Sequence, residues 1–310
     1  MMLIQAITKN YMNEFTLLLF YKIVSEGSFS KAAEDLYISQ PAVTKQIKSL
    51  EAELEIKLFD RTSSGVALTP GGKILLEHTS RILSQYSKLR NDISLLSEQL
   101  TGELTIGAST TIAQYVLPPL LARFQSANPS LKITLLNENT QTIEKLLHNG
   151  RISLGIIEGL PRGKALKYSL FTKDELIVIT HKSSKYASLK SVTLEKLKGI
   201  NLVLREKGSG TLEVFEEYLK SKNHSLRDMK ILIQLGSTES IKSFLRHTDA
   251  MGVVSVQAMA DSLQAQEFKA VELEEGRIYR NFYFVHSKDT PDKLVRKFIS
   301  FLKNSYNQKL

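Results

Sequence analysis

The spacing of apolar residues changes along this chain, and each change marks a different kind of element. Up to residue 54, apolar residues recur every three or four positions, as they do on the buried face of a helix. A first helix is predicted over residues 13–26, and Gly27 ends it. In the short helix that follows, the inward residues Ala32 and Ala33 are small enough to let a neighbouring helix approach closely. The chain therefore begins with a tight group of short helices.

A third helix, over residues 40–54, has two faces of opposite character. Val43, Ile47, Leu50 and Leu54 form one apolar stripe, whereas the other side carries glutamine, threonine and lysine. Lysine neutralises phosphate or reaches guanine, glutamine pairs with adenine, and threonine bonds a base or touches a thymine methyl. This face suits a DNA major groove, although a solvated face on an ordinary helical hairpin has the same composition. The residues here that we predict to contact DNA are Lys31, Ser39, Gln40, Pro41, Thr44, Lys45 and Lys48.

Residues 72–100 carry the period of a coiled coil. Apolar residues alternate there at spacings of four and three over several heptads. One small domain cannot bury a stripe of this length, so it predicts pairing with a second copy of the chain; packing against the second half of the same chain is the alternative. The predicted dimerisation residues are Leu75, Ile82, Tyr86, Leu89, Ile93 and Leu96, in a seam that also holds Thr79 and Leu100.

From residue 101 onward, predicted strands alternate with predicted helices. This alternation is typical of an α/β fold with mainly parallel sheets, covered on both faces, and ligands near the carboxyl ends of the strands. Strands are predicted at 104–107, 132–136, 154–158, 176–180, 202–204, 231–234, 252–255, 268–273 and 278–285. Helices are predicted at about 111–127, 140–148, 211–222, 237–246, 257–264 and 291–303.

Length and composition exclude several classes of protein. A length of 310 residues suggests about two ordinary domains. The chain has no cysteine, which excludes disulfides, thiolate metal sites and thiol redox switches. The apolar run at residues 17–21 is far too short to span a membrane, and we recognise no secretion signal. We therefore expect a cytoplasmic protein that does not engage membranes.

The net charge of +9 is unevenly distributed. Residues 1–100 hold 11 basic and 11 acidic side chains, so the entire excess lies in residues 101–310. DNA contact by the first part would therefore depend on where a few cations are placed. The basic second part either favours an anionic ligand or simply keeps the protein in solution.

One stretch of the first part resembles a known family closely. Gly27-Ser-Phe-Ser-Lys-Ala-Ala-Glu-Asp-Leu-Tyr-Ile-Ser-Gln-Pro-Ala-Val-Thr-Lys-Gln-Ile-Lys-Ser-Leu-Glu51, followed by Leu58-Phe-Asp-Arg-Thr62 and Leu68-Thr-Pro-Gly71, is similar to the LysR-type transcriptional regulators. The resemblance implies a winged helix-turn-helix domain over residues 12–71, a linker and dimerisation helix over 72–100, and an effector-binding domain over 101–310 with two lobes like a periplasmic binding protein.

The resemblance also implies details of each part. Lobe I is expected at about 101–170 and 270–305, and lobe II at about 171–269. Residues 1–11 precede the usual family start and form an extension, so Met12 is an alternative initiator. Arg61 resembles the family's wing arginine and is assigned to a phosphate or the minor groove, with bracing of the hairpin as the alternative.

Partners follow from the same resemblance. It implies binding to double-stranded DNA at an imperfect palindromic operator, a small-molecule co-inducer, a homodimer that usually becomes a homotetramer, and RNA polymerase as a further partner. The stretch Arg205-Glu-Lys-Gly-Ser-Gly-Thr211 is similar to a subgroup that regulates carbon fixation and sulfur assimilation. That subgroup commonly has an arginine next, where this chain has Leu212, so the identity of the ligand does not transfer.

Several strand-to-helix turns of the second part are rich in hydroxyl groups and glycine. Free amides and hydroxyls at a helix start bind carboxylate, sulfate or phosphate oxygens, although each such Ser or Thr is also an ordinary helix cap. In a two-lobed fold these turns should converge on one cleft, so we expect a small, anionic effector there. The candidate residues are Ser109, Thr110, Thr111, Glu158, Arg205, Ser209, Gly210, Thr211, Ser237 and Thr238.

Catalytic and metal-binding patterns are missing from the sequence. The six histidines are scattered without a His-Glu-x-x-His spacing, and there is no Gly-x-Ser-x-Gly elbow. We therefore expect no enzyme activity, no metal and no cofactor. A small-molecule binding protein of the periplasmic type, with no DNA role, is the alternative; the winged head and the missing signal argue against it.

Overall fold

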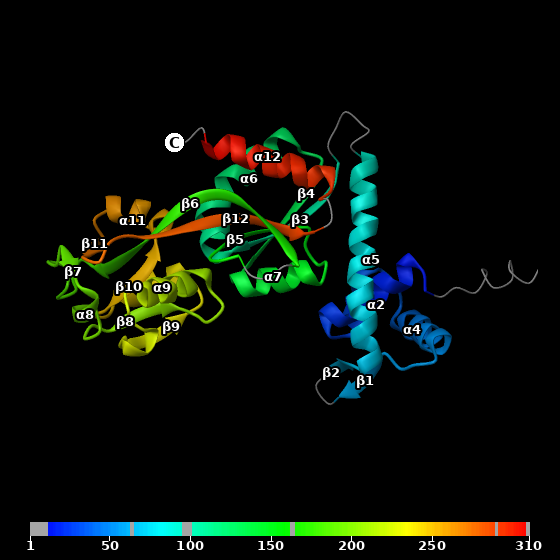
Figure 1. Ribbon diagram of the computed structural model, residues 1–310. Helices are drawn as coiled ribbons and strands as arrows, with labels where there is room; N and C mark the ends of the chain where they lie inside the picture. Colours follow the sequence, from blue (N-terminus) through cyan, green and yellow to red (C-terminus); the bar gives the residue numbers. More distant parts are fainter. Residues whose placement is uncertain (1–11, 63–64, 95–100, 162–164, 289–290, 308–310) are drawn as a thin grey trace, which may run out of the picture. The chain divides into compact units, whose positions relative to one another are not determined.

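The computed structural model describes residues 12–62, 65–94, 101–161, 165–288 and 291–307 (Figure 1). The chain divides into two compact units, one built mainly from the residues up to Arg90 and the other from most of the residues that follow. The expected N-terminal extension, residues 1–11, lies outside the described residues. None of the described helices combines the length and hydrophobicity needed to cross a membrane.

The first unit is a group of helices with a small hairpin. At its start the Asn13 side chain accepts a hydrogen bond from the Thr16 amide at 2.9 Å, and Gly27 ends the first helix with a φ of 61°. Glycine adopts this left-handed conformation without steric cost. The elements are α2 (Glu14–Glu26), α3 (Phe29–Asp35), α4 (Gln40–Leu54), β1 (Phe59–Thr62), β2 (Gly65–Leu68) and α5 (Pro70–Ser94).

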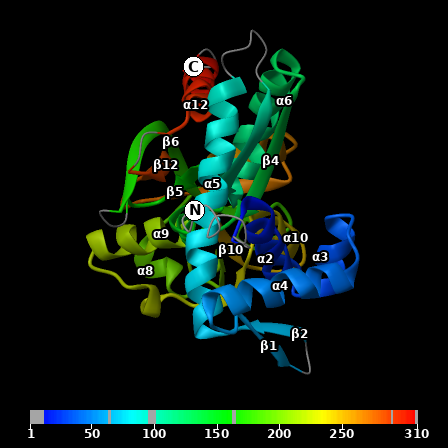
Figure 2. The same ribbon diagram turned by 90° about the vertical axis from the view of Figure 1, so that its right-hand side faces the viewer.

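One apolar core holds this unit together. Phe20 of α2, Ala32 of α3, and Val43 and Leu50 of α4 are each 0 % exposed and belong to it. Figure 2 shows α2, α3 and α4 gathered beside α5. The small side chain at position 32 allows α3 to lie close to its neighbours, as the sequence pattern predicted.

The long helix α5 leaves the unit's core after its first turns. Leu75 packs against that core, and Thr79 is buried. Further along the helix the predicted seam is open to solvent: Ile82 is 39 %, Tyr86 38 %, Leu89 55 % and Ile93 58 % exposed. Leu96 and Leu100 lie outside the described residues. A single chain therefore leaves an apolar stripe on α5 uncovered by the described residues of its own unit.

The second unit is built on one large sheet. Its strands are β3 (Gly102–Ser109), β4 (Leu131–Glu138), β5 (Leu154–Glu158), β6 (Leu166–His181), β7 (Ser191–Val192), β8 (Leu202–Arg205), β9 (Ile231–Leu235), β10 (Met251–Ser255), β11 (Phe268–Leu273) and β12 (Ile278–Ser287). The strand order is β4-β3-β5-β12-β6-β10-β8-β9, and β11 pairs with β6. Pairing is parallel among β3, β4 and β5 and among β8, β9 and β10, whereas β6 and β12 are antiparallel to each other.

Two lobes form because helices cover different stretches of this sheet. The helices are η1 (Ile112–Val116), α6 (Leu117–Ala127), α7 (Thr140–His148), α8 (Leu194–Leu197), α9 (Gly210–Ser221), η2 (Leu226–Asp228), α10 (Thr238–Leu245), η3 (Val256–Ala258), α11 (Ala260–Gln264) and α12 (Lys293–Asn307). In lobe I, α6 and α12 cover one face and α7 the other (Figure 1). In lobe II, α8 and α9 pack on one side, and α10 packs on a separate cluster.

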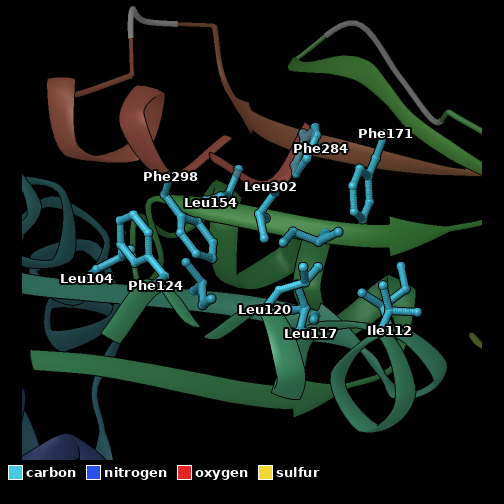
Figure 3. Close-up of a cluster of buried hydrophobic side chains, with 14 of the residues drawn as sticks. Leu104, Ile112, Leu117, Leu120, Phe124, Leu154, Phe171, Phe284, Phe298 and Leu302 are labelled. Carbon is cyan, nitrogen blue, oxygen red and sulfur yellow. The ribbon is translucent and has the colours of Figure 1, made fainter. Parts of the chain in front are cut away.

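The core of lobe I is rich in aromatic side chains (Figure 3). Phe124 of α6 and Phe298 of α12 meet edge to face, with ring centroids 4.9 Å apart. Leu104 of β3 and Phe284 of β12 lie in the same cluster. Residues from the beginning and the end of the second unit therefore complete one core.

The chain passes between the lobes along β6 and β12. We expected the second crossing near residue 270, but Ala270 and Val271 pair with β6 in lobe II. Within β12, Ile278 lies in the core of lobe II and Phe282 in that of lobe I. The second crossing is thus later than expected, because one uninterrupted strand makes it. The predicted α/β class, with a winged helix-turn-helix, a long helix and two lobes, is confirmed.

Candidate functional site

The first candidate site is the polar face of α4. Ser39 caps this helix by accepting a hydrogen bond from the Ala42 amide at 3.4 Å. The Gln40 side-chain amide donates to the Thr44 hydroxyl at 3.1 Å, which lines up two polar groups along one face. Within the described residues, the Lys45 ammonium group has no ion-pair partner. The helix therefore offers an amide, a hydroxyl and a free cation on the side away from its core.

The structure leaves the predicted DNA-contacting residues of α3 and α4 accessible. Thr44 is half-buried, and the exposed residues are Lys31, Ser39, Gln40, Pro41, Lys45 and Lys48. Arg61 lies on β1 opposite Val66, and its side chain is outside what the structure describes. Contact of these residues with DNA stays a prediction.

The turn between α3 and α4 adds a residue that the sequence pattern did not single out as a contact. Tyr37 has a φ of 56° and is 95 % exposed. A bulky residue rarely adopts this left-handed conformation. The next amide, that of Ile38, donates to the Ala33 carbonyl at 3.0 Å and closes the turn. Tyr37 therefore presents an exposed hydroxyl on the turn that precedes α4, and tyrosine is one of the side chains that donate to phosphates in protein–DNA complexes.

The second candidate site is a buried cluster of hydroxyl groups around the Glu158 carboxylate. Glu158 ends β5 and is 1 % exposed. The Ser109 hydroxyl donates to Glu158 Oε2 at 2.7 Å, and the Thr111 and Thr211 hydroxyls donate to Oε1 at 3.4 and 3.3 Å. Four predicted effector residues are therefore brought together. Three of them donate their hydroxyl protons to the carboxylate of the fourth, Glu158.

An ion pair on the two crossing strands completes this cluster. Arg280 of β12 donates through Nε to Asp174 Oδ2 of β6 at 2.6 Å, and through Nη1 to the Thr211 hydroxyl at 2.9 Å. Arg280 Nη1 also lies 3.5 Å from Glu158 Oε1. The Ser255 hydroxyl lies 2.9 Å from both Asp174 carboxylate oxygens. The Arg280 guanidinium group therefore lies next to two buried carboxylates, those of Asp174 and Glu158.

Burial has an electrostatic cost for Asp174. It raises the pKa of the Asp174 carboxyl above its usual value, and the neighbouring Arg280 and Ser255 oppose this shift without cancelling it. Because the pKa is higher in the folded state than in the unfolded one, the ionised carboxylate lowers stability near neutral pH, and this loss is relieved as the pH falls through the folded-state pKa toward the unfolded-state value.

Arg205 provides a second buried cation. It is 1 % exposed, and its Nη2 donates to the Thr110 hydroxyl at 3.1 Å. Its Nε donates to Glu206 Oε2 at 2.8 Å. Within the described residues, Nη1 has no hydrogen-bond partner, and the same is true of Arg280 Nη2. Buried guanidinium nitrogens are rarely left unpaired, so each of these two nitrogens is a donor available to a further acceptor.

The remaining predicted effector residues act as helix caps or spacers. Ser209 accepts from the Thr211 amide at 3.2 Å, and Ser237 caps α10, where Thr238 is buried in the first turn. Gly210 lies against Glu158: a Cβ at position 210 would come within 2.2 Å of the Glu158 carbonyl oxygen. The absence of a side chain at position 210 therefore allows α9 of lobe II to meet β5 of lobe I.

Other contacts also join the lobes around this cluster. The Tyr115 hydroxyl of lobe I donates to the Glu239 carboxylate of lobe II, and burial together with this carboxylate raises the pKa of the Tyr115 phenol. The backbone N–H of Gln141 in lobe I donates to the backbone carbonyl of Gly208 in lobe II at 3.2 Å. The described residues contain no group of three or more His, Asp and Glu side chains arranged to hold a metal ion.

Comparison with known proteins identifies the family. A family model for a bacterial regulatory helix-turn-helix protein of the lysR family matches residues 16–73, and one for the LysR substrate binding domain matches residues 97–307. CysL of Bacillus subtilis (strain 168), an HTH-type transcriptional regulator, is 31% identical over 294 residues, which cover 94% of this chain and 97% of CysL. The chain belongs to the LysR family. It is a LysR-type transcriptional regulator with a helix-turn-helix and an effector-binding domain.

Solved structures of LysR regulators share its fold. Full-length CbnR, determined in complex with its target DNA, has a TM-score of 0.70 at 20% identity and covers 95% of this chain and 100% of CbnR. The regulatory domain of CcmR from Synechocystis PCC6803, determined in complex with 2-PG, has a TM-score of 0.59 at 24% identity. It covers 66% of this chain and 96% of the CcmR domain.

In this LysR regulator, three charged or polar residues of the buried cluster were not predicted from the sequence: Asp174, Ser255 and Arg280. A signal for one of them was present. Ile278, Arg280 and Phe282 occupy alternate positions of one strand, and all three are buried. A charged residue in the apolar phase of a strand indicates a buried polar partner.

The buried arrangement predicts a large effect on stability when Arg280 is replaced. In Arg280→Met, the Asp174 and Glu158 carboxylates lose their shared cation, so the free energy of unfolding should fall by about 3–5 kcal/mol. Urea unfolding of the full chain measures this change. The control is Arg246→Met, which removes an exposed pair with Glu267 and should cost no more than about 1 kcal/mol. Equal losses in the two variants would contradict the assigned role of Arg280.

Proposed function

We propose that this LysR regulator acts as a homodimer that reads an imperfect palindrome in double-stranded DNA, and that a small anion held between its effector lobes modulates this binding. The observation that carries the proposal is the division of α4 into two faces. Val43, Ile47 and Leu50 are buried in the core, while Gln40 and Lys45 are exposed on the other side. The resulting helix has the polar front that major-groove recognition needs.

In this proposal, base contacts and phosphate contacts have different sources. Gln40 and Thr44 lie on the polar side of α4 and are assigned to base edges, with Lys45 reaching either guanine or phosphate. Lys31, Lys48 and Arg61 are assigned to phosphates or the minor groove. Because residues 1–100 carry as many acidic as basic side chains, these few cations supply the electrostatic attraction.

The uncovered stripe of α5 supports a dimer. Apolar residues that recur every three or four positions and stay 38–58 % exposed are favourable to bury against a second helix of the same kind. Two winged heads joined in this way would meet two half-sites about 10 bp, or a multiple of that distance, apart. Higher assembly to a tetramer and contact with RNA polymerase in the cytoplasm belong to the same proposal by family resemblance.

The effector part of the proposal rests on charge and hydrogen-bond donors. Ser109, Thr111 and Thr211 point their hydroxyls at one place, and Arg205 and Arg280 each retain a buried nitrogen without a partner among the described residues. Such donors suit a carboxylate, sulfate or phosphate group. A ligand that binds one arrangement of the lobes better than another shifts the population of the two, and the CcmR regulatory domain, determined in complex with 2-PG, is a precedent for a liganded domain of this fold.

The assigned face of α4 can be tested on duplexes that the full-length protein selects from a random library. Lys45→Ala or Thr44→Ala should weaken binding by about 1–3 kcal/mol, because a base-edge contact is lost. Fluorescence anisotropy measures the affinity. Lys297→Ala, which removes an exposed lysine from α12, should bind like the parent protein. Parental affinity in both α4 variants would refute the assignment.

The role of α5 can be tested by sedimentation velocity. Leu89→Asp places a charge in the exposed apolar stripe and should shift the full chain from dimer to monomer at micromolar concentration. Ser84→Asp introduces the same charge on the opposite side of the helix and should leave the dimer intact. A Leu89→Asp protein that sediments as a dimer would show that α5 does not form the interface.

The effector site can be tested by thermal shift of the full chain with phosphates, sulfate and small carboxylates. A binding anion should raise the midpoint and change the affinity for the selected duplex. Ser109→Ala or Thr211→Val should remove both effects, because each deletes a hydroxyl donor of the cluster. Ser126→Ala, on the far end of α6, is the control. An unchanged response in the first two variants would place the ligand elsewhere.

A further inference from the structure

The Glu158 carboxylate is bound in the manner of a ligand. Three hydroxyls donate to it, from Ser109 in β3, Thr111 before η1 and Thr211 in α9, and Arg280 Nη1 lies 3.5 Å away. These donors come from three separate segments of the chain, since Ser109 and Thr111 lie two residues apart. An oxyanion of an effector would need the same set, so Glu158 occupies the place where such a group would bind.

The number of hydroxyl protons makes this occupation exclusive. A serine or threonine hydroxyl has one proton to donate. The protons of Ser109, Thr111 and Thr211 are directed at Glu158, so they cannot also be donated to a second acceptor in this arrangement. A ligand oxyanion therefore gains these donors only when the Glu158 carboxylate leaves them.

Charge reinforces this exclusion. Arg280 is already paired with Asp174 at 2.6 Å, and Asp174, Arg280 and Glu158 are all at least 96 % buried, since their exposed fractions are 4 %, 4 % and 1 %. The three groups together carry more negative than positive formal charge. Another anion placed beside Glu158 would be repelled strongly, because charges are poorly screened in the interior.

We propose that Glu158 is a built-in substitute for the effector's oxyanion, and that the effector binds by displacing its carboxylate from Ser109, Thr111 and Thr211. The proposal rests on the proposed function of this cluster as the effector site. It also explains how effector binding changes the contact between the two lobes. Glu158 belongs to lobe I and Thr211 to lobe II, so the hydrogen bond that the effector replaces is one that joins the two lobes.

Removal of the substitute should open the site to a small anion. In Glu158→Ala the donors remain while the competing carboxylate is gone, so acetate or sulfate should bind at least about tenfold more tightly than in the parent protein, because a like charge has been removed. Isothermal titration calorimetry and the thermal midpoint of the full chain measure this. Sodium chloride at matched ionic strength controls for general screening. The same anions should restore part of the stability that the variant has lost.

Two further variants keep the test decisive. Glu158→Gln retains the shape of the side chain without its charge and should gain less anion affinity than Glu158→Ala, because the amide still fills the place. Glu144→Ala removes another buried glutamate of lobe I, which accepts from the Tyr168 hydroxyl at 2.8 Å, and should gain none. If Glu158→Ala does not fold, a rise in anion affinity in Glu158→Gln carries the test.

The outcomes separate this proposal from the function on which it rests. If the parent protein binds an anion through Ser109 and Thr211 but neither Glu158 variant gains affinity, the effector site stands and Glu158 is not its substitute. If a Glu158 variant loses the parent's anion binding, Glu158 recognises the effector directly and the displacement proposal is overturned. If no anion binds any of these proteins and duplex affinity never responds, the proposed effector site itself fails.

Discussion

The buried pair of Arg280 and Asp174 is the interaction on which the second unit depends. The two residues lie on β12 and β6, the antiparallel strands that run through both lobes. Each ion has lost most of its water, so each is tolerated only because of the other and of the hydroxyls around them. Arg280 also lies beside Glu158 of lobe I and Thr211 of lobe II. The ion pair therefore places the charge of the effector cluster at the point where the lobes meet.

In the proposed mechanism, effector binding at this cluster changes contacts between the lobes without disturbing their cores. The lobes share polar contacts, among them Arg205 with Thr110 and Thr211 with Glu158. Hydrogen bonds exchange with a ligand or with water far more readily than a packed apolar core rearranges. Each lobe keeps its own apolar core, so the lobes can change their relation while their interiors stay intact. A small ligand bound at this cluster would therefore act directly on the polar contacts between the two lobes.

Sequence reasoning found the features that local patterns encode. The two faces of α4 and the end of α2 at Gly27 depend on neighbours in the chain, and the structure has them as predicted. The Asp174–Arg280 pair joins residues 106 positions apart, so no local pattern reveals it. The second lobe crossing was misplaced because Ile278 of one core and Phe282 of the other lie on the same buried face of a single strand, β12. The sequence identified the candidate hydroxyl groups. Only the folded structure shows that those of Ser109, Thr111 and Thr211 converge on Glu158.

In the proposed dimer, two winged heads, each reading a major groove with the polar face of α4, are held together by α5. Hydroxyl-radical footprinting of the full-length protein on a selected duplex tests it most directly. We expect two protected half-sites, separated by about 10 bp or a multiple of it and related by an imperfect dyad. Protection that is uniform along the duplex and independent of its sequence would contradict this mode of binding.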